Sequence, residues 1–279
     1  MIRGLCFLGQ TNSAHNLQII FRICCKIAGF KRRRYTKCFT HQPNQGGLIM
    51  TMQTLYTANG NLIRRRTKDG VVPVIRVCRD EYEVDQQELL LWALLNWRIV
   101  SFAQIGPLYE KANRQNPLQT SRSSQDCTHR LLTRGLLISG MGNTEYDALY
   151  DLLARRFVRP VSGGLLSKVL AFLRVTLFDG ISLRTALTLF RIDRRSASER
   201  KVMRLANQVP LSCAEIIQCL NLNVQTIPSE DAVMDALYTE PDLTCDNFPQ
   251  KVYGSQHSRE VIEAVAGLYL RKQILLDTY

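Results

Sequence analysis

The sequence predicts a mainly α-helical protein with a short β-rich segment ahead of the helices. From residue 85 to the end, apolar side chains recur at spacings of three and four, the pattern of helices with one buried face. Residues typical of strands gather before that point, between 50 and 83. The chain has 279 residues, and single hydrophobic cores stop growing at about 250 to 300 residues, so we expect two domains.

The first 49 residues differ from the rest. They hold four of the nine cysteines, the run KRRR and no Asp or Glu, and they carry +8 of the formal net charge of +12. Three interpretations are open: a start codon assigned too far upstream, with initiation at Met50 or Met52; an Arg-rich targeting peptide; or a basic arm for nucleic acid. We treat residues 1–49 as a doubtful or disordered leader.

Residues 50–83 are predicted to form a β-hairpin lead-in. Asn59 and Gly60 stand between two strand-like runs, which is the strongest short-range signal for a tight hairpin. The run from Val71 to Val77 is also β-rich, and Pro73 within it would confine this strand to the edge of a sheet.

Three helices are predicted next, within residues 84–160. The first covers 85–97 and is dense in leucine, the second is capped by Ser101, and the third begins at Ser123 and stops at Gly135. A strand, a Gly-Met-Gly-Asn turn, a second short strand and a fourth helix are expected to follow.

This order resembles the winged helix-turn-helix superfamily, and most of all small bacterial repressors of the MarR and penicillinase-repressor kind. The likeness is carried by residues 121–153, SRSSQDCTHRLLTRGLLISGMGNTEYDALYDLL, in which Cys127 and Leu131 are four apart and Arg134 to Leu137 match the passage from recognition helix to wing. The resemblance implies a winged-helix domain over 84–160 that binds double-stranded DNA. The MGNTEY segment departs from the family because it has no Arg or Lys to reach a minor groove.

Short polar side chains at the start of the third helix suit a contact with base edges in the major groove, where helix-terminal N–H groups also meet phosphate. The candidate DNA-binding residues are Arg122, Ser123, Gln125, Asp126, Thr128, His129 and Arg130. The alternative is structural: Ser123 and Asp126 cap the helix, and the remaining side chains are solvated.

Residues 161–279 are predicted to form a helical domain, a bundle in preference to a second helix-turn-helix. Capping boxes open two of its helices, at Ser196 and at Ser212. The last 22 residues read as a terminal helix that packs onto the bundle or forms a homodimer. Seven basic residues within 184–204 and six acids within 230–246 could extend a DNA-binding face or pair with one another.

Signals of catalysis, metal binding and membrane insertion are absent from the sequence. There is no phosphate-binding loop, dinucleotide-binding motif or metalloprotease motif, and the chain has four His and no CxxC pair. The longest apolar run, 165–178, is short and contains Lys168 and Arg174. We therefore expect no enzyme, no cofactor and no membrane partner, and scattered thiols indicate the reducing cytoplasm.

The predicted function is sequence-specific DNA binding, as in a transcriptional regulator. The alternative is a non-enzymatic adaptor that uses the winged helix and the helical bundle to bind proteins.

Overall fold

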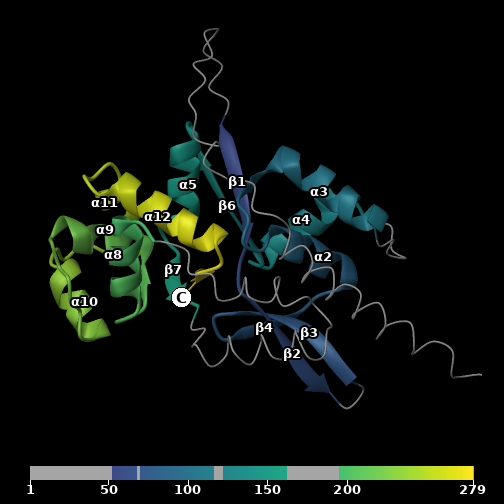
Figure 1. Cartoon of the computed structure of the whole chain (residues 1–279), viewed down its shortest axis with the longest axis horizontal. Helices are drawn as coiled ribbons and strands as arrows, with labels where there is room; N and C mark the ends of the chain where they lie inside the picture. The colour runs from purple at the N-terminus through teal and green to yellow at the C-terminus, as the bar shows by residue number, and fades with distance from the viewer. Residues whose placement is uncertain (1–51, 68–69, 116–121, 162–194, 279) are drawn as a thin grey trace, which may run out of the picture. The chain divides into compact units, whose positions relative to one another are not determined.

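The computed structural model describes residues 52–67, 70–115, 122–161 and 195–278 (Figure 1). These form two compact units, which meet in the sequence between Leu152 and Leu153. The doubtful leader and the apolar run 165–178 lie outside the described residues.

The expectation of a mainly α protein with a short β-rich lead-in is wrong. Three antiparallel sheets of three strands each accompany the helices in the described ranges, and two of these sheets are built from strands far apart in the sequence. Their strands are short, and several have only two to four residues, so they give little period-two signal.

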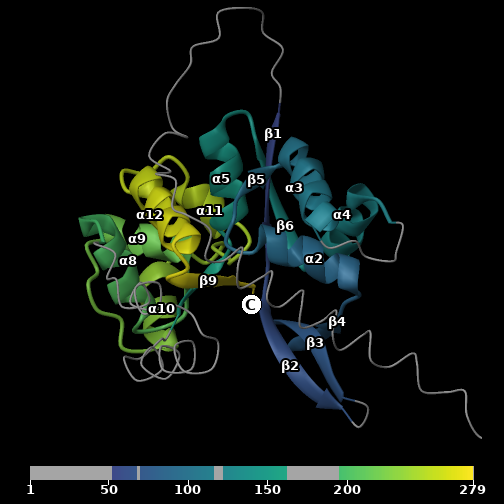
Figure 2. The same cartoon turned by 45° about the vertical axis from the view of Figure 1, so that its right-hand side comes forward.

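Where the structure describes it, the first unit contains a sheet with the order β5-β1-β6 and four helices (Figures 1 and 2). The strands are β1 (Gln53–Ala58), β5 (Val100–Ser101) and β6 (Leu137–Gly142). The helices are α2 (Gln86–Leu95), α3 (Phe102–Gln115), α4 (Ser124–Thr133) and α5 (Glu145–Leu153). Three of them match the helices predicted near residues 85, 101 and 123. The core centres on Trp92, whose indole Nε1 donates to the Asn59 carbonyl oxygen at 2.8 Å.

The predicted wing hairpin is absent, which corrects the winged helix-turn-helix expectation. β6 runs through the supposed Gly-Met-Gly-Asn turn, pairs with β1 and is followed directly by α5. The glycines serve close packing: a Cβ on Gly140 would lie 2.3 Å from the backbone nitrogen of Leu152, and one on Gly142 would lie 2.4 Å from that of Ala148. The residues that suggested a turn therefore let a helix lie against a strand.

Asn59 and Gly60 also do not make the expected hairpin. The chain passes here from β1 into a second sheet, β2-β3-β4, with β2 (Asn61–Thr67), β3 (Gly70–Val77) and β4 (Asp80–Glu83). Gly60 has φ +85°, and a Cβ on it would lie 2.5 Å from the Arg76 carbonyl oxygen. Pro73 lies in the central strand, one residue before the ladder with β4 begins.

The described residues of the second unit form a sheet and five helices, so the predicted helical bundle is wrong. Its strands are β7 (Phe157–Pro160), β8 (Leu211–Ser212) and β9 (Ile274–Asp277), in the order β8-β7-β9. Its helices are α8 (Ala197–Ala206), α9 (Cys213–Asn221), α10 (Glu230–Leu237), α11 (Phe248–Val252) and α12 (Ser258–Leu270). The expected terminal helix stops at Leu270, because Lys272 adopts φ 61° and turns the chain into β9.

The second unit repeats the arrangement of the first. In each, the strand that precedes the helices (β1 or β7) is central, a two-residue strand (β5 or β8) pairs with one side of it, and the strand after the last core helix (β6 or β9) pairs with the other. The registers agree: Leu55 lies opposite Ser101 and Gly140, as Phe157 lies opposite Ser212 and Asp277. We call this common arrangement the repeated core; its helices are α2, α3 and α4 in one unit and α8, α9 and α12 in the other.

The sequences of the two cores match at a constant spacing of 111 residues around their first two helices. Six residues recur unchanged: Glu88, Leu94, Asn96, Ser101, Ala103 and Ile105 correspond to Glu199, Leu205, Asn207, Ser212, Ala214 and Ile216. Five of these pairs lie in helix caps or in the buried faces of the helices. The repeat therefore preserves the positions that start and pack the helices.

Candidate functional site on helices α3 and α4

Helix α4 carries most of the predicted DNA-binding residues, and its start is fixed by a side-chain cap. Ser123 is the N-cap, and its Oγ accepts the Asp126 N–H at 3.1 Å and donates to the Asp126 carboxylate at 2.7 Å. Thr128 is buried, and its hydroxyl donates to the Ser124 carbonyl oxygen at 2.7 Å. Three of the seven residues thus make contacts within the helix itself.

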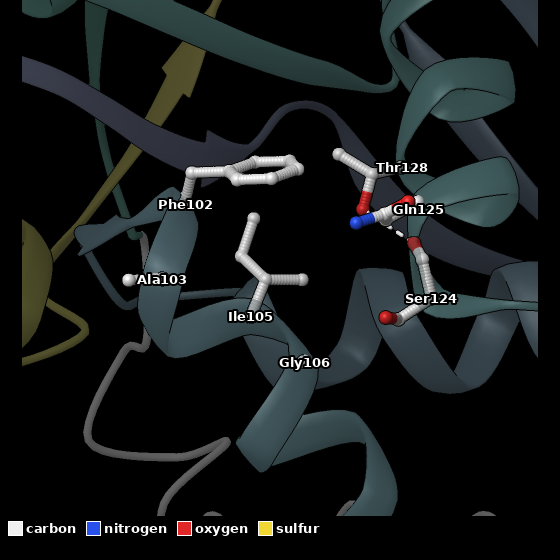
Figure 3. A pocket seen from close by; sticks show the side chains of 7 residues that line it. All are labelled: Phe102, Ala103, Ile105, Gly106, Ser124, Gln125 and Thr128. Carbon is white, nitrogen blue, oxygen red and sulfur yellow. Dashed lines mark hydrogen bonds between the residues drawn. The ribbon is translucent and has the colours of Figure 1, made fainter.

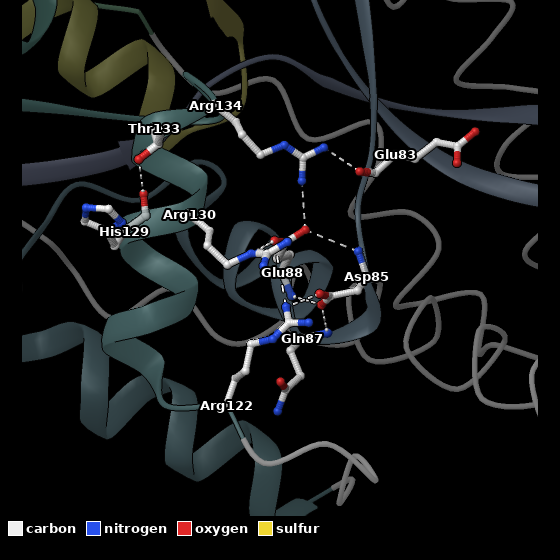
Figure 4. A network of polar contacts seen from close by, with 9 residues as sticks. All are labelled: Glu83, Asp85, Gln87, Glu88, Arg122, His129, Arg130, Thr133 and Arg134. Atoms are coloured by element: carbon white, nitrogen blue, oxygen red, sulfur yellow. Dashed lines mark hydrogen bonds and ion pairs between the residues drawn. The ribbon is translucent and has the colours of Figure 1, made fainter.

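The two predicted arginines point back to helix α2 (Figure 4). Arg130 Nε donates to Glu88 Oε1 at 2.6 Å, and Arg122 forms an ion pair with Asp85. Arg134, which caps the end of α4, adds a hydrogen bond from Nη1 to Glu88 Oε2 at 2.9 Å. We call these five residues the acid–arginine cluster. It joins α4 to the N-terminal end of α2.

Glu88 is the centre of this cluster, with a side chain only 1% exposed. It also completes a capping box, because its carboxylate accepts the Asp85 N–H at 3.3 Å. The second unit has the same device: Glu199 accepts the Ser196 N–H at 2.8 Å and forms an ion pair with Arg271. This recurrence indicates that the central glutamate and the helix-capping arginine belong to the repeated core.

Opposing effects act on the Asp85 carboxyl. Partial burial favours its neutral form, but the Glu88 N–H and the Arg122 guanidinium together outweigh burial and hold the pKa of Asp85 below its usual range. Nearby, burial is the main cause that raises the pKa of Tyr109 to about 12, and the neighbouring Cys127 thiol adds to it. Burial likewise raises the pKa of Cys127, so this thiol is a packing group and no nucleophile.

Six of the seven predicted residues are exposed, and the buried one is Thr128. Apart from Ser123, Arg122 and Arg130, these are Gln125, Asp126 and His129, which include no Lys or Arg. The exposed face of α4 therefore has little positive charge of its own, since Arg122 and Arg130 are paired with carboxylates.

A pocket lies between the N-terminal halves of α3 and α4 (Figure 3). Its volume is about 180 Å³, and it is lined by Phe102, Ala103, Ile105, Gly106, Ser124, Gln125 and Thr128. The Phe102 ring stands at one side, Ile105 lies below it, and Gln125 and Thr128 face it from α4. Gln125 is thus the predicted residue that lines a cavity while also reaching solvent.

Exposed apolar side chains continue from this pocket onto the sheet. Phe102 is 47% exposed, and its ring centroid lies 5.9 Å from that of Tyr56 on β1. Met141, 55% exposed, lies opposite Thr54 and so is a diagonal neighbour of Tyr56 on the same face. With Met52, 64% exposed just before β1, these residues form what we call the α3 apolar surface: Met52, Tyr56, Phe102 and Met141.

Sequence reasoning missed the α3 apolar surface because its members come from three separate segments. In the sequence, Phe102 belongs with Ile105 to the apolar stripe of the helix predicted after Ser101, where core burial is the ordinary outcome. Its position as the first residue of α3, directly after a two-residue strand, is what leaves it half exposed. A self-comparison at a spacing of 111 gives a further signal, since Phe102 corresponds to the small Cys213.

Among the described residues, no group of three or more His, Cys, Asp or Glu side chains is arranged to hold a metal ion. In the same part of the chain, no helix has both the length and the apolar character needed to cross a membrane. Comparisons with protein-family models, with curated proteins and with solved structures give no match.

Proposed function

We propose that this chain is a non-enzymatic protein-binding protein, and that the pocket between α3 and α4, with the α3 apolar surface, is its binding site. The observation that carries the proposal is the half-exposed Phe102 beside a pocket that has apolar groups on its α3 side and polar groups on its α4 side. Exposed aromatic and methionine side chains grouped on one face are typical of protein interfaces.

The size of the pocket favours a protein over a small molecule. Sites for drug-sized ligands occupy roughly 300 to 1,000 Å³, and this pocket has about 180 Å³. That volume suits one apolar side chain, since a cavity of about 150 Å³ holds a benzene ring. A single anchoring side chain in a pocket, with a wider surface around it, is the usual form of an interface hot spot.

The charges favour protein over DNA at this surface. Phosphate contacts need Lys or Arg side chains that can neutralise phosphates and release the counterions condensed on the DNA, and the arginines of α4 are already paired with Asp85 and Glu88. In addition, residues 1–49 carry +8 of the net +12, which leaves little excess charge for the rest of the chain.

A random-peptide display library tests this function. With the full chain as bait, we expect enrichment of peptides that share one apolar or aromatic anchor. Their binding should be lost with Phe102→Asp, a change that α3 tolerates because an acid suits the first turn of a helix. Met234→Asp is the matched control, since Met234 is an equally exposed apolar residue on α10. Peptides that bind both variants alike would contradict the assignment of the site.

DNA binding is kept as a second candidate, at a different place. Arg200, Lys201 and Arg204 are exposed on α8, and none of the three is in an ion pair among the described residues. Such a row can bind phosphate. If it does, affinity for random duplex DNA should fall steeply with salt, and Arg204→Ala should flatten that slope by about one unit. Binding that does not respond to Arg204→Ala would exclude this row.

A further inference from the structure

The residues that line the pocket have counterparts in the second unit, where they are covered. At the spacing of 111, Phe102, Ile105 and Gly106 correspond to Cys213, Ile216 and Ile217, each of which is 0% exposed. Phe102 itself is 47% exposed. The same surface of the repeated core is therefore closed in one unit and open in the other.

The segment that follows α9 supplies contacts over this surface in the second unit. The Tyr238 hydroxyl donates to Glu215 Oε1 at 2.9 Å, and Glu215 corresponds to Gln104 in the first turn of α3. The Tyr238 ring lies 4.8 Å from that of Phe248 in α11. Phe248 and Val252 are each 1% exposed, and α11 packs against α9.

The first unit has no room in its sequence for such a cover between the equivalent helices. Only residues 116–123 separate α3 from α4, whereas residues 222–257 separate α9 from α12. At 1.5 Å per helical residue, eight residues are too few to form a helix across this surface and also return the chain to α4. A helix on the open surface must come from outside this connection.

We infer that the pocket and the α3 apolar surface receive a short helix of a partner protein, with an aromatic and an aliphatic side chain four residues apart. Phe248 and Val252 of α11 are the pattern for this ligand, because both are buried on a helix that packs against α9, the counterpart of α3. The aromatic side chain enters the pocket between Phe102 and Thr128, and the aliphatic one lies on the α3 apolar surface. This inference rests on the proposed protein-binding function and names the chemistry of its ligand.

A peptide of residues 238–254, with Cys245 replaced by serine, is a suitable probe. Contacts within the segment help to hold its shape: the Asn247 amide donates to the Asp242 carbonyl oxygen at 2.7 Å, and Lys251 Nζ donates to Glu240 at 2.7 Å. The labelled peptide is titrated with the full chain and followed by fluorescence anisotropy. We expect saturable binding that weakens at least tenfold with Phe102→Asp in the chain, is unchanged by Met234→Asp, and is lost with Phe248→Ala in the peptide.

Two results overturn the inference. One is the absence of saturable peptide binding. The other is peptide binding that Phe102→Asp leaves unchanged, because the peptide then displaces α11 from the surface that it covers in the second unit. The display library separates this failure from a failure of the proposed function. If library peptides bind through Phe102 while the probe does not, the site binds protein and only the helical pattern is wrong. If neither binds, both proposals fall.

Discussion

Glu88→Ala should destabilise the first unit by about 3 kcal/mol. The substitution removes a capping contact worth about 1 kcal/mol and two charge-assisted hydrogen bonds, each worth roughly 1.5 to 3 kcal/mol when buried. The side chains of Arg130 and Arg134 are 51% and 28% exposed, so we take about half of that value for each bond. The sum is about 3 kcal/mol, at the lower end of the roughly 3 to 5 kcal/mol that breaking a buried pair typically costs, because the two arginines left behind reach solvent.

Urea unfolding followed by tryptophan fluorescence measures this effect in the first unit alone, because both tryptophans, Trp92 and Trp97, lie there. With a slope of about 2 kcal/mol per molar urea, the midpoint should fall by about 1.5 M. Glu110→Ala is the control: Glu110 pairs with Arg114 at 3.6 Å on the surface, which is worth at most about 0.5 kcal/mol. Equal shifts for Glu88→Ala and Glu110→Ala would refute the central role given to Glu88.

Three further predictions concern packing, thiol reactivity and pH. Gly140→Ala should cost more than about 3 kcal/mol in the same assay, since its Cβ would meet backbone at 2.3 Å. Gly135→Ala, with φ +68° and open space, should cost only about 1 to 2 kcal/mol. The exposed Cys78 should react with a thiol reagent in the native protein, whereas Cys213, buried and with a raised pKa, should react only on unfolding; peptide mass mapping distinguishes them. Because the pKa of Asp85 is lowered from 3.8, the contribution of its carboxylate to stability is present above that pH and is lost as the pH falls below it. The urea midpoint of the first unit should therefore fall on the acid side, and Asp85→Asn should make this fall smaller. A pH profile that Asp85→Asn leaves unchanged would contradict the pairing of Asp85 with Arg122.

The helices of the first unit could be predicted because their signals are local. Asp85 and Ser123 cap α2 and α4 as the sequence indicates, and Ser101 lies at the start of α3. The capping boxes at Ser196 and Ser212 are likewise confirmed at the starts of α8 and α9. At these positions the residue that begins the helix also satisfies its free N–H groups, so no distant contact is needed.

The sheets could not be predicted because their pairing is long-range. β1 pairs with β6 across about eighty residues, and nothing near Leu137 in the sequence identifies β1 as the partner. Gly140 and Gly142 were assigned to a turn, although glycine also permits a close approach of helix and strand. The candidate site could not be predicted for the same reason. Arg122 and Arg130 can be recognised in the sequence as positive charges, but the carboxylates that pair with them lie on a different helix.

The ion pair shared by the two cores has a consequence for how such a fold can accept added sequence. Each central glutamate meets an arginine at the far end of the core and so closes a loop of chain, 46 residues long in the first unit and 72 in the second (Glu199 to Arg271). Loop-closure entropy grows only with the logarithm of length, so the longer loop costs about 0.4 kcal/mol more. A single charge-assisted hydrogen bond exceeds that cost. The connection between the second and third core helices is thus a place where a segment as long as that of α10 and α11 can be inserted with little thermodynamic penalty.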